Sequence, residues 1–151
     1  MATTIDRHSR LSAANRSVAQ KTCIYLGIFL LVAGFGGVIT PGLLGMHLSL
    51  LHNVVHITAG GLALWSGLSD VSGKARIFSI SFGSLFLFLG IAGFMFGKVG
   101  YPGVGNMEAD SNLLRIIPNA LELGTSDHVV HLLLGTVFMV SAYLSKRENH
   151  P

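Results

Sequence analysis

Four long apolar runs alternate with polar segments along the chain. They span about residues 22–39, 48–68, 77–96 and 127–144. Each run is close to the roughly 20 residues that a helix needs to cross about 30 Å of hydrocarbon. The pattern therefore predicts an all-α fold, a bundle of four transmembrane helices in which the first is an uncleaved anchor.

The polar segments around these runs differ in length and character. Residues 1–21 form a polar N-terminal tail, and residues 146–151 form a short C-terminal tail. Residues 97–126 contain the turn signals Tyr-Pro-Gly and Gly-Asn, followed by the apolar stretch "SNLLRIIPNALEL". We expect this stretch to include a helix along the membrane surface, in a loop that is either functional or a plain cap over the bundle.

The two halves of the membrane domain repeat the same spacing of small and polar residues. The first run carries Gly27, Gly34 and Gly37, and the third carries Gly83, Gly90 and Gly93; the second carries Asn53, His56 and Gly60, and the fourth carries His128, His131 and Gly135. This repetition predicts a duplicated helical hairpin whose copies cross the membrane in the same sense. The glycines form stripes, so we interpret them as packing residues that let helix backbones approach closely.

Composition and charge agree with insertion into a membrane. Half of the 151 residues are hydrophobic and only 11% are charged, unlike a soluble domain of this size. If four helices alternate, most basic residues collect on one side: Arg7, Arg10, Arg16, Lys21, Lys74, Arg76, Lys146 and Arg147. The positive-inside rule then places both termini in the cytoplasm. These residues meet anionic headgroups, so we expect the lipid bilayer, and no nucleic acid, as their partner.

Histidines in the second and fourth runs are the candidate chemistry of this chain. His52 and His56 are four residues apart and His128 and His131 are three apart, so each pair lies on one helix face. Such pairs can chelate a metal ion, with Asp127 as a further ligand or a supporting partner. The metal hypothesis therefore includes His52, His56, His128, His131 and Asp127.

Two other interpretations of the same histidines are open. A tetrapyrrole, haem or chlorophyll, can be held axially by His56 and His131, with His52 and His128 in support and nearby glycines giving space for the ring. Alternatively, the asparagine and histidine side chains simply form hydrogen bonds between helices, because an unpaired polar group is costly inside a bilayer. The last interpretation predicts a structural or interaction role, as an accessory subunit of a larger membrane complex or as a homo-oligomer.

The sequence contains no further pattern that indicates catalysis. It has no phosphate-binding glycine loop, no GxSxG elbow and no pair of carboxylates at a defined spacing. Cys23 is the only cysteine, so the chain has neither an internal disulfide nor a cysteine-based metal cage. We therefore do not expect an enzyme.

The glycine-striped helices, the two "N/H-x-x-H-x-x-x-G" helices, the "SNLLRIIPN" loop and the restart "DHVVHLLLG" suggest a family. From about Cys23 to Leu144 the chain resembles the bacterial membrane proteins grouped as domain of unknown function 4383. The resemblance implies a four-helix integral membrane fold and no particular activity. In that family the last helix begins with an Asp-Asn-x-x-His pattern, so His128 replaces an asparagine here, and His52 is a second added histidine.

Overall fold

The computed structural model describes residues 16–69, 73–105 and 108–148. Its helices are α2 (Val18–Ile39), α3 (Leu50–Leu68), α4 (Lys74–Phe96) and α5 (Thr125–Glu148), with a short 3₁₀ helix, η1 (Leu43–Gly45), before α3. Its strands are β1 (Lys98–Gly100), β2 (Asp110–Ile117) and β3 (Leu121–Leu123). The ends of the predicted tails, residues 1–15 and 149–151, lie outside the described residues, and so do Arg7 and Arg10.

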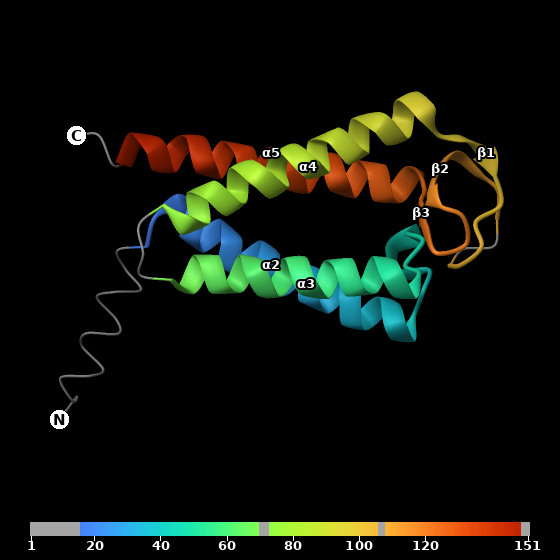
Figure 1. The fold of residues 1–151 in the computed structure, drawn as a ribbon, viewed down its shortest axis with the longest axis horizontal. Coiled ribbons are helices and arrows are strands. Elements are labelled where there is room, and N and C mark those ends of the chain that lie inside the picture. The colour runs from blue at the N-terminus through green and yellow to red at the C-terminus, as the bar shows by residue number, and fades with distance from the viewer. Residues whose placement is uncertain (1–15, 70–72, 106–107, 149–151) are drawn as a thin grey trace.

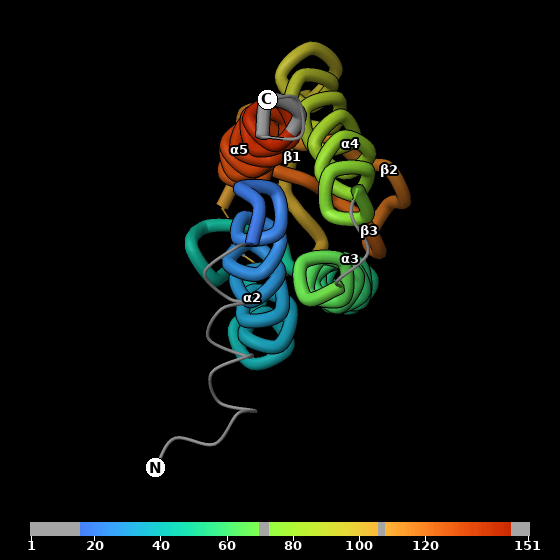
Figure 2. Tube along the Cα trace, turned by 90° about the vertical axis from the view of Figure 1, so that its left-hand side faces the viewer, coloured from blue at the N-terminus to red at the C-terminus, as the bar shows by residue number. Residues whose placement is uncertain are grey.

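The four helices lie side by side along the long axis of the molecule, and the strands cover one end of the bundle (Figure 1). Helix α2 packs mainly on α3, and α4 mainly on α5. Figure 2 shows the two pairs stacked, with α3 beside α4 on one side and α2 beside α5 on the other. Helix α2 begins and α5 ends at the end opposite the strands (Figure 1).

Capping residues set where the helices begin. Ser17 and Gln20 form a capping box, because the Gln20 N–H donates to Ser17 Oγ at 3.2 Å and the Ser17 N–H donates to Gln20 Oε1 at 2.9 Å. Helix α2 therefore starts at Val18, inside the predicted polar tail of residues 1–21. Similarly, Ser49 caps α3 by accepting a hydrogen bond from the His52 N–H at 3.3 Å.

The described residues form a mostly helical structure with the four long helices, but the surface helix expected in residues 97–126 is not there. The segment forms a three-stranded antiparallel sheet in the order β1-β2-β3. A single helix of this length is marginal on its own, whereas the strands satisfy each other's backbone groups. Leu113 and Leu123 are buried under the sheet, and Arg115 pairs with Glu122 across β2 and β3, with Nε 3.0 Å from Oε1.

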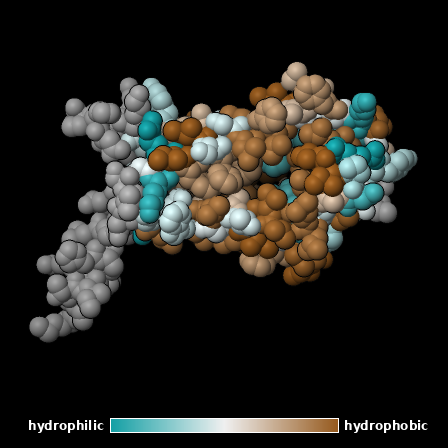
Figure 3. Space-filling view, in the orientation of Figure 1, coloured by the Kyte–Doolittle hydropathy of each residue, from teal (hydrophilic) through white to brown (hydrophobic). Residues whose placement is uncertain are grey.

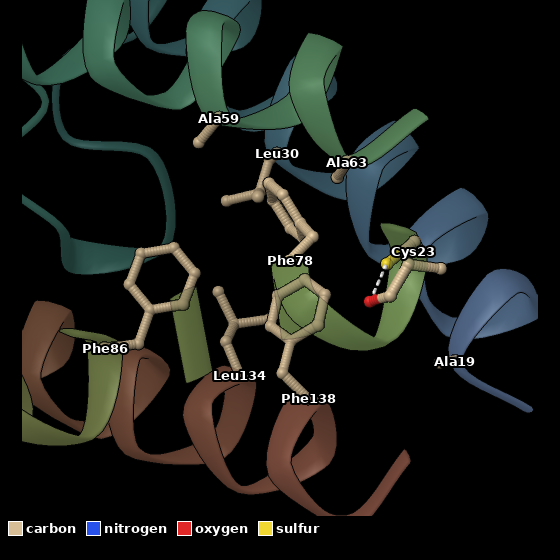
Figure 4. Packing of buried hydrophobic residues seen from close by; sticks show 10 residues of the cluster. Ala19, Cys23, Leu30, Ala59, Ala63, Phe78, Phe86, Leu134 and Phe138 are labelled. Atoms are coloured by element: carbon tan, nitrogen blue, oxygen red, sulfur yellow. Dashed lines mark hydrogen bonds between the residues drawn. The ribbon is translucent and has the colours of Figure 1, made fainter. Parts of the chain in front are cut away.

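Aromatic and small side chains from all four helices form the core (Figure 4). Phe138 of α5 packs edge to face on Phe78 of α4, with ring centroids 5.6 Å apart. The lone cysteine, Cys23, is buried and donates its thiol to the Ala75 carbonyl oxygen, 3.5 Å away (Figure 4). Alanines such as Ala63 fill the space between α2 and the aromatic cluster, so the helices approach closely.

The outside of the bundle is apolar. In the part of the chain that the structure describes, three helices are long and apolar enough to cross a membrane, namely α2, α4 and α5 over Thr125–Ser145. Figure 3 shows hydrophobic residues over the middle of the molecule and hydrophilic residues at its ends. Helix α3, with 19 residues, is not among these three helices, and it carries buried polar side chains in its first two turns, as α5 also does.

Candidate metal centre

Three buried histidines meet in the half of the bundle that lies nearest the strands. His52 and His56 come from α3 and His131 comes from α5, and one ring nitrogen from each lies within 4.8 Å of the others. Their side chains are at most 4% exposed. His56 and His131 are each six residues beyond the first residue of their helix, about 9 Å along the axis, so the two helices present them at the same depth.

Local packing fixes the three rings. The His52 and His56 rings are in edge contact, with centroids 4.4 Å apart, as expected for residues one turn apart on a helix. The His131 ring stacks on Phe86 of α4 at 5.3 Å and lies 6.2 Å from the His52 ring. The cluster therefore combines residues from two helices and is backed by an aromatic ring from a third.

A buried carboxylate stands behind the cluster. Asp127 is 1% exposed, and its Oδ2 accepts the backbone N–H groups of Gly124 at 2.8 Å and His47 at 3.1 Å. Its other oxygen, Oδ1, lies 4.0 Å from His52 Nδ1 and has no hydrogen-bond partner among the described residues. Asp127 is thus a neighbour of His52 and is not part of the compact group that the three histidines form.

His47 connects the cluster to the segment at the strand-bearing end of the bundle. Its carbonyl oxygen lies 3.0 Å from His52 Nδ1, and its own Nε2 lies 3.4 Å from Asp110 Oδ2. Burial opposes ionisation of Asp110, but hydrogen bonds from Asn112, Thr125 and His47 lower its pKa below the usual range. The sequence analysis missed both His47 and Asp110, although His47 stands two residues before the cap of α3.

His128 does not belong to the cluster. Its Nε2 donates to the carbonyl oxygen of Asn112 on β2 at 2.7 Å, and its ring packs against Gly93 and Phe94 of α4. This nitrogen is held by the sheet, and of the predicted ligands the structure brings together His52, His56 and His131, without His128 and Asp127. The strand that engages His128 is part of the sheet that the sequence did not predict.

The glycines predicted to serve packing are all buried at helix contacts: Gly27, Gly34, Gly37, Gly60, Gly83, Gly90, Gly93 and Gly135. Their contacts match between the two helix pairs. A Cβ atom added at Gly27 would lie 3.0 Å from the Gly60 carbonyl oxygen, and one at Gly83 would lie 3.2 Å from that of Gly135. Similarly, Asn53 fills the space left by Gly37, and His128 fills the space left by Gly93.

A cavity of about 60 Å³ adjoins the three histidines. The rest of its wall is apolar: Val55 from α3, Phe82, Leu85, Phe86 and Leu89 from α4, and Ile116, Leu121 and Leu123 from the strands. Figure 3 shows a hollow between α3 and α4, with hydrophobic surface around it and hydrophilic surface inside. The histidines therefore adjoin space that is several times what one water molecule requires.

The geometry fits an ion better than a tetrapyrrole. Three imidazoles at about 2.0–2.1 Å from Zn²⁺ would have their nitrogens about 3.4 Å apart. This separation lies within the 4.8 Å that bounds the observed group of nitrogens. By contrast, a ring held axially by His56 and His131 needs a wide flat space, and the His52 and Phe86 rings occupy it. The cavity of about 60 Å³ is also far smaller than the pocket that a tetrapyrrole ring would need, which is at least roughly 300 Å³.

The fold and the site together define a helical bundle with a buried three-histidine centre. Comparison of the chain with protein-family models, with curated proteins and with solved structures found no match in any of the three. The resemblance to domain of unknown function 4383 stays a prediction.

Proposed function

We propose that this chain is a multi-pass integral membrane protein that binds one divalent transition-metal ion, with Zn²⁺ as the reference ion, through His52, His56 and His131. The observation that carries the proposal is the convergence of three buried ring nitrogens from two helices. Imidazole suits zinc, copper, iron and nickel, and the absence of a carboxylate among the three ligands disfavours the harder cations. Three protein ligands leave a coordination position open.

Metal binding explains features that hydrogen bonding between helices does not. Nδ1 of His56 and Nδ1 of His131 are buried and have no hydrogen-bond partner among the described residues. Interhelical hydrogen bonding, the structural interpretation, would satisfy such atoms with donors or acceptors on the facing helix. A metal ion instead uses one nitrogen of each ring, and it offsets the cost of holding three imidazoles in an apolar interior.

The membrane arrangement is the second part of the proposal. Three apolar helices and the apolar outer surface support insertion. We propose that α3 also spans, which gives four crossings with both ends in the cytoplasm of a bacterial inner membrane, and that the chain arose by duplication of a helical hairpin. Matching glycine contacts in the α2–α3 and α4–α5 pairs support the duplication. We also propose that the chain is related to domain of unknown function 4383. The apolar outer surface would contact lipid, further membrane subunits or a second copy of the chain.

Binding, and not catalysis, is the function proposed. Besides the three histidines, the described cavity wall carries only apolar side chains. A hydrolytic or proton-transferring site would place a carboxylate or hydroxyl beside the open coordination position. Asp127, the nearest buried carboxylate, lies behind His52 instead.

Metal analysis of protein purified in mild detergent tests this function. After incubation with Zn²⁺ and removal of free ion, the wild-type chain should retain an equimolar amount of zinc. His56→Gln and His131→Gln should each abolish stoichiometric retention, because two imidazoles hold zinc far more weakly than three. An absorption spectrum of the same samples should show no Soret or chlorophyll band.

His128→Gln is the matched control. The glutamine amide can still donate to the Asn112 carbonyl, so this variant should fold and retain zinc like the wild type. If a folded His128→Gln protein lost its zinc, His128 would also be a ligand, as in the four-histidine set predicted from the sequence. A folded wild-type protein that retains no metal would contradict the proposal, and it would favour the structural role instead.

A further inference from the structure

The cavity beside the three histidines is open toward the side of the bundle. Val55 on α3, Leu85 on α4 and Ile116 on β2 all line the cavity, and they are 44%, 47% and 44% exposed. They therefore mark its mouth. The hollow visible between α3 and α4 in Figure 3 lies on the same face of the molecule.

This mouth extends from the strands at the end of the bundle, at Ile116, to the depth of membrane hydrocarbon, at Leu85. Leu85 is eleven residues before Phe96, the last residue of α4, which places it about 16 Å from that end of the helix. A hydrocarbon layer is about 30 Å thick, so Leu85 is near its middle. Helix α4 is one of the three helices apolar enough to span. The part of the mouth at Leu85 therefore opens toward lipid.

Charge defines what can occupy the open coordination position. A divalent ion held by three neutral imidazoles carries two positive charges into a buried site, and Asp127 behind His52 supplies one negative charge. One positive charge remains, and in a medium of low dielectric it is stabilised by a single anionic ligand. The described cavity wall supplies no such group.

We propose that the fourth ligand of the metal is the carboxylate of a single-chain lipid amphiphile, a long-chain fatty acid, which enters laterally between α3 and α4. The head group binds the ion, the first methylene groups contact the apolar wall, and the remaining chain stays in the bilayer through the mouth. This inference rests on the proposed metal centre, and it adds the class of ligand and its route. Small carboxylates from water share the head-group chemistry and are separated from fatty acids by the test.

The test follows the visible absorption of Co²⁺ bound to the full chain in non-ionic detergent, because the Co²⁺ spectrum reports a change of the fourth ligand. Laurate, acetate and dodecanol are added in turn. Laurate should change the spectrum at a concentration about 100-fold below that of acetate, since several methylene groups leave water. Dodecanol has the chain without the carboxylate and should leave the spectrum unchanged.

Two tryptophan variants test the lateral route. Leu85→Trp narrows the mouth and should raise the laurate concentration required by at least about tenfold. Leu62→Trp is the matched control, because Leu62 on α3 is 43% exposed and does not line the cavity. Both variants should bind Co²⁺ like the wild type.

The outcomes separate the two proposals. Equal potency of laurate and acetate, an effect of dodecanol, or equal effects of Leu85→Trp and Leu62→Trp would overturn the fatty-acid ligand and leave the metal centre in place. A wild-type protein that gives no bound Co²⁺ spectrum would overturn both.

Discussion

The Nδ1 atom of His52 lies 3.0 Å from the carbonyl oxygen of His47. A carbonyl oxygen only accepts, so the proton of the neutral His52 ring is on Nδ1 and the lone pair is on Nε2. Metal-ligating histidines commonly donate their other N–H to a carbonyl or carboxylate, which fixes the tautomer and the ring orientation. The segment before α3 therefore fixes the tautomer and the orientation of the His52 ring, so that its Nε2 carries the lone pair that a metal ion would need.

The carboxylate behind His52 gives the first prediction. Asp127→Asn removes the negative charge that lies 4.0 Å from His52 Nδ1, while the amide oxygen can still accept the Gly124 N–H. We expect zinc affinity to fall by about 10–100-fold, as for other outer-sphere partners of metal-bound histidines. Competition with a chelating dye measures the affinity, and circular dichroism checks the fold. Unchanged affinity in a folded Asp127→Asn protein would remove Asp127 from the centre.

The contact between Gly93 and the His128 ring gives the second prediction. A Cβ atom at position 93 would overlap the ring, which β2 holds through Asn112. Gly93→Ala should therefore destabilise the protein by about 1–3 kcal/mol, the usual range for overpacking. In Gly61→Ala the new methyl group meets nothing within 4 Å, so stability should stay the same or rise slightly. Thermal unfolding in detergent measures both, and equal effects would contradict the packing described here.

The pH response of the sheet gives the third prediction. Burial opposes ionisation of Glu122, but hydrogen bonds from the Gly103 and Asn119 N–H groups and the Arg115 side chain lower its pKa below the usual range. A lowered folded-state pKa gives stability that is present above the unfolded-state pKa and is lost as pH falls through the folded-state pKa. The wild-type melting temperature should thus fall on acidification below about pH 4. Glu122→Gln should melt lower at neutral pH and lose less on acidification; parallel curves for the two proteins would contradict this role.

The sequence predicted the helices well because each depends on a long apolar run, a signal that needs no tertiary context. The helix starts were less accurate, since Ser17 and Gln20 form a readable capping box that the polar composition of the tail obscured. The strands were missed for a physical reason. β1 and β3 have three residues each, and they exist only because β2 lies between them.

The candidate site could be predicted only in part. Spacing placed His52 and His56 on one face of α3, but the choice between His128 and His131 depends on how α5 is rotated against α3 and α4. That rotation is set by Gly93 and by the bond from His128 to β2, which sequence spacing does not contain. His47 was missed because it acts through its backbone carbonyl, a role that any residue type can fill.

X-ray absorption spectroscopy at the zinc edge of the zinc-loaded chain tests the central claim most directly. The proposed centre predicts three imidazole nitrogens at about 2.0–2.1 Å from zinc and one further ligand that binds through oxygen or nitrogen. The His131→Gln spectrum should lose one imidazole, and the His128→Gln spectrum should match the wild type. A zinc shell of oxygen ligands without imidazole scattering, or one unchanged by His131→Gln, would contradict the three-histidine centre.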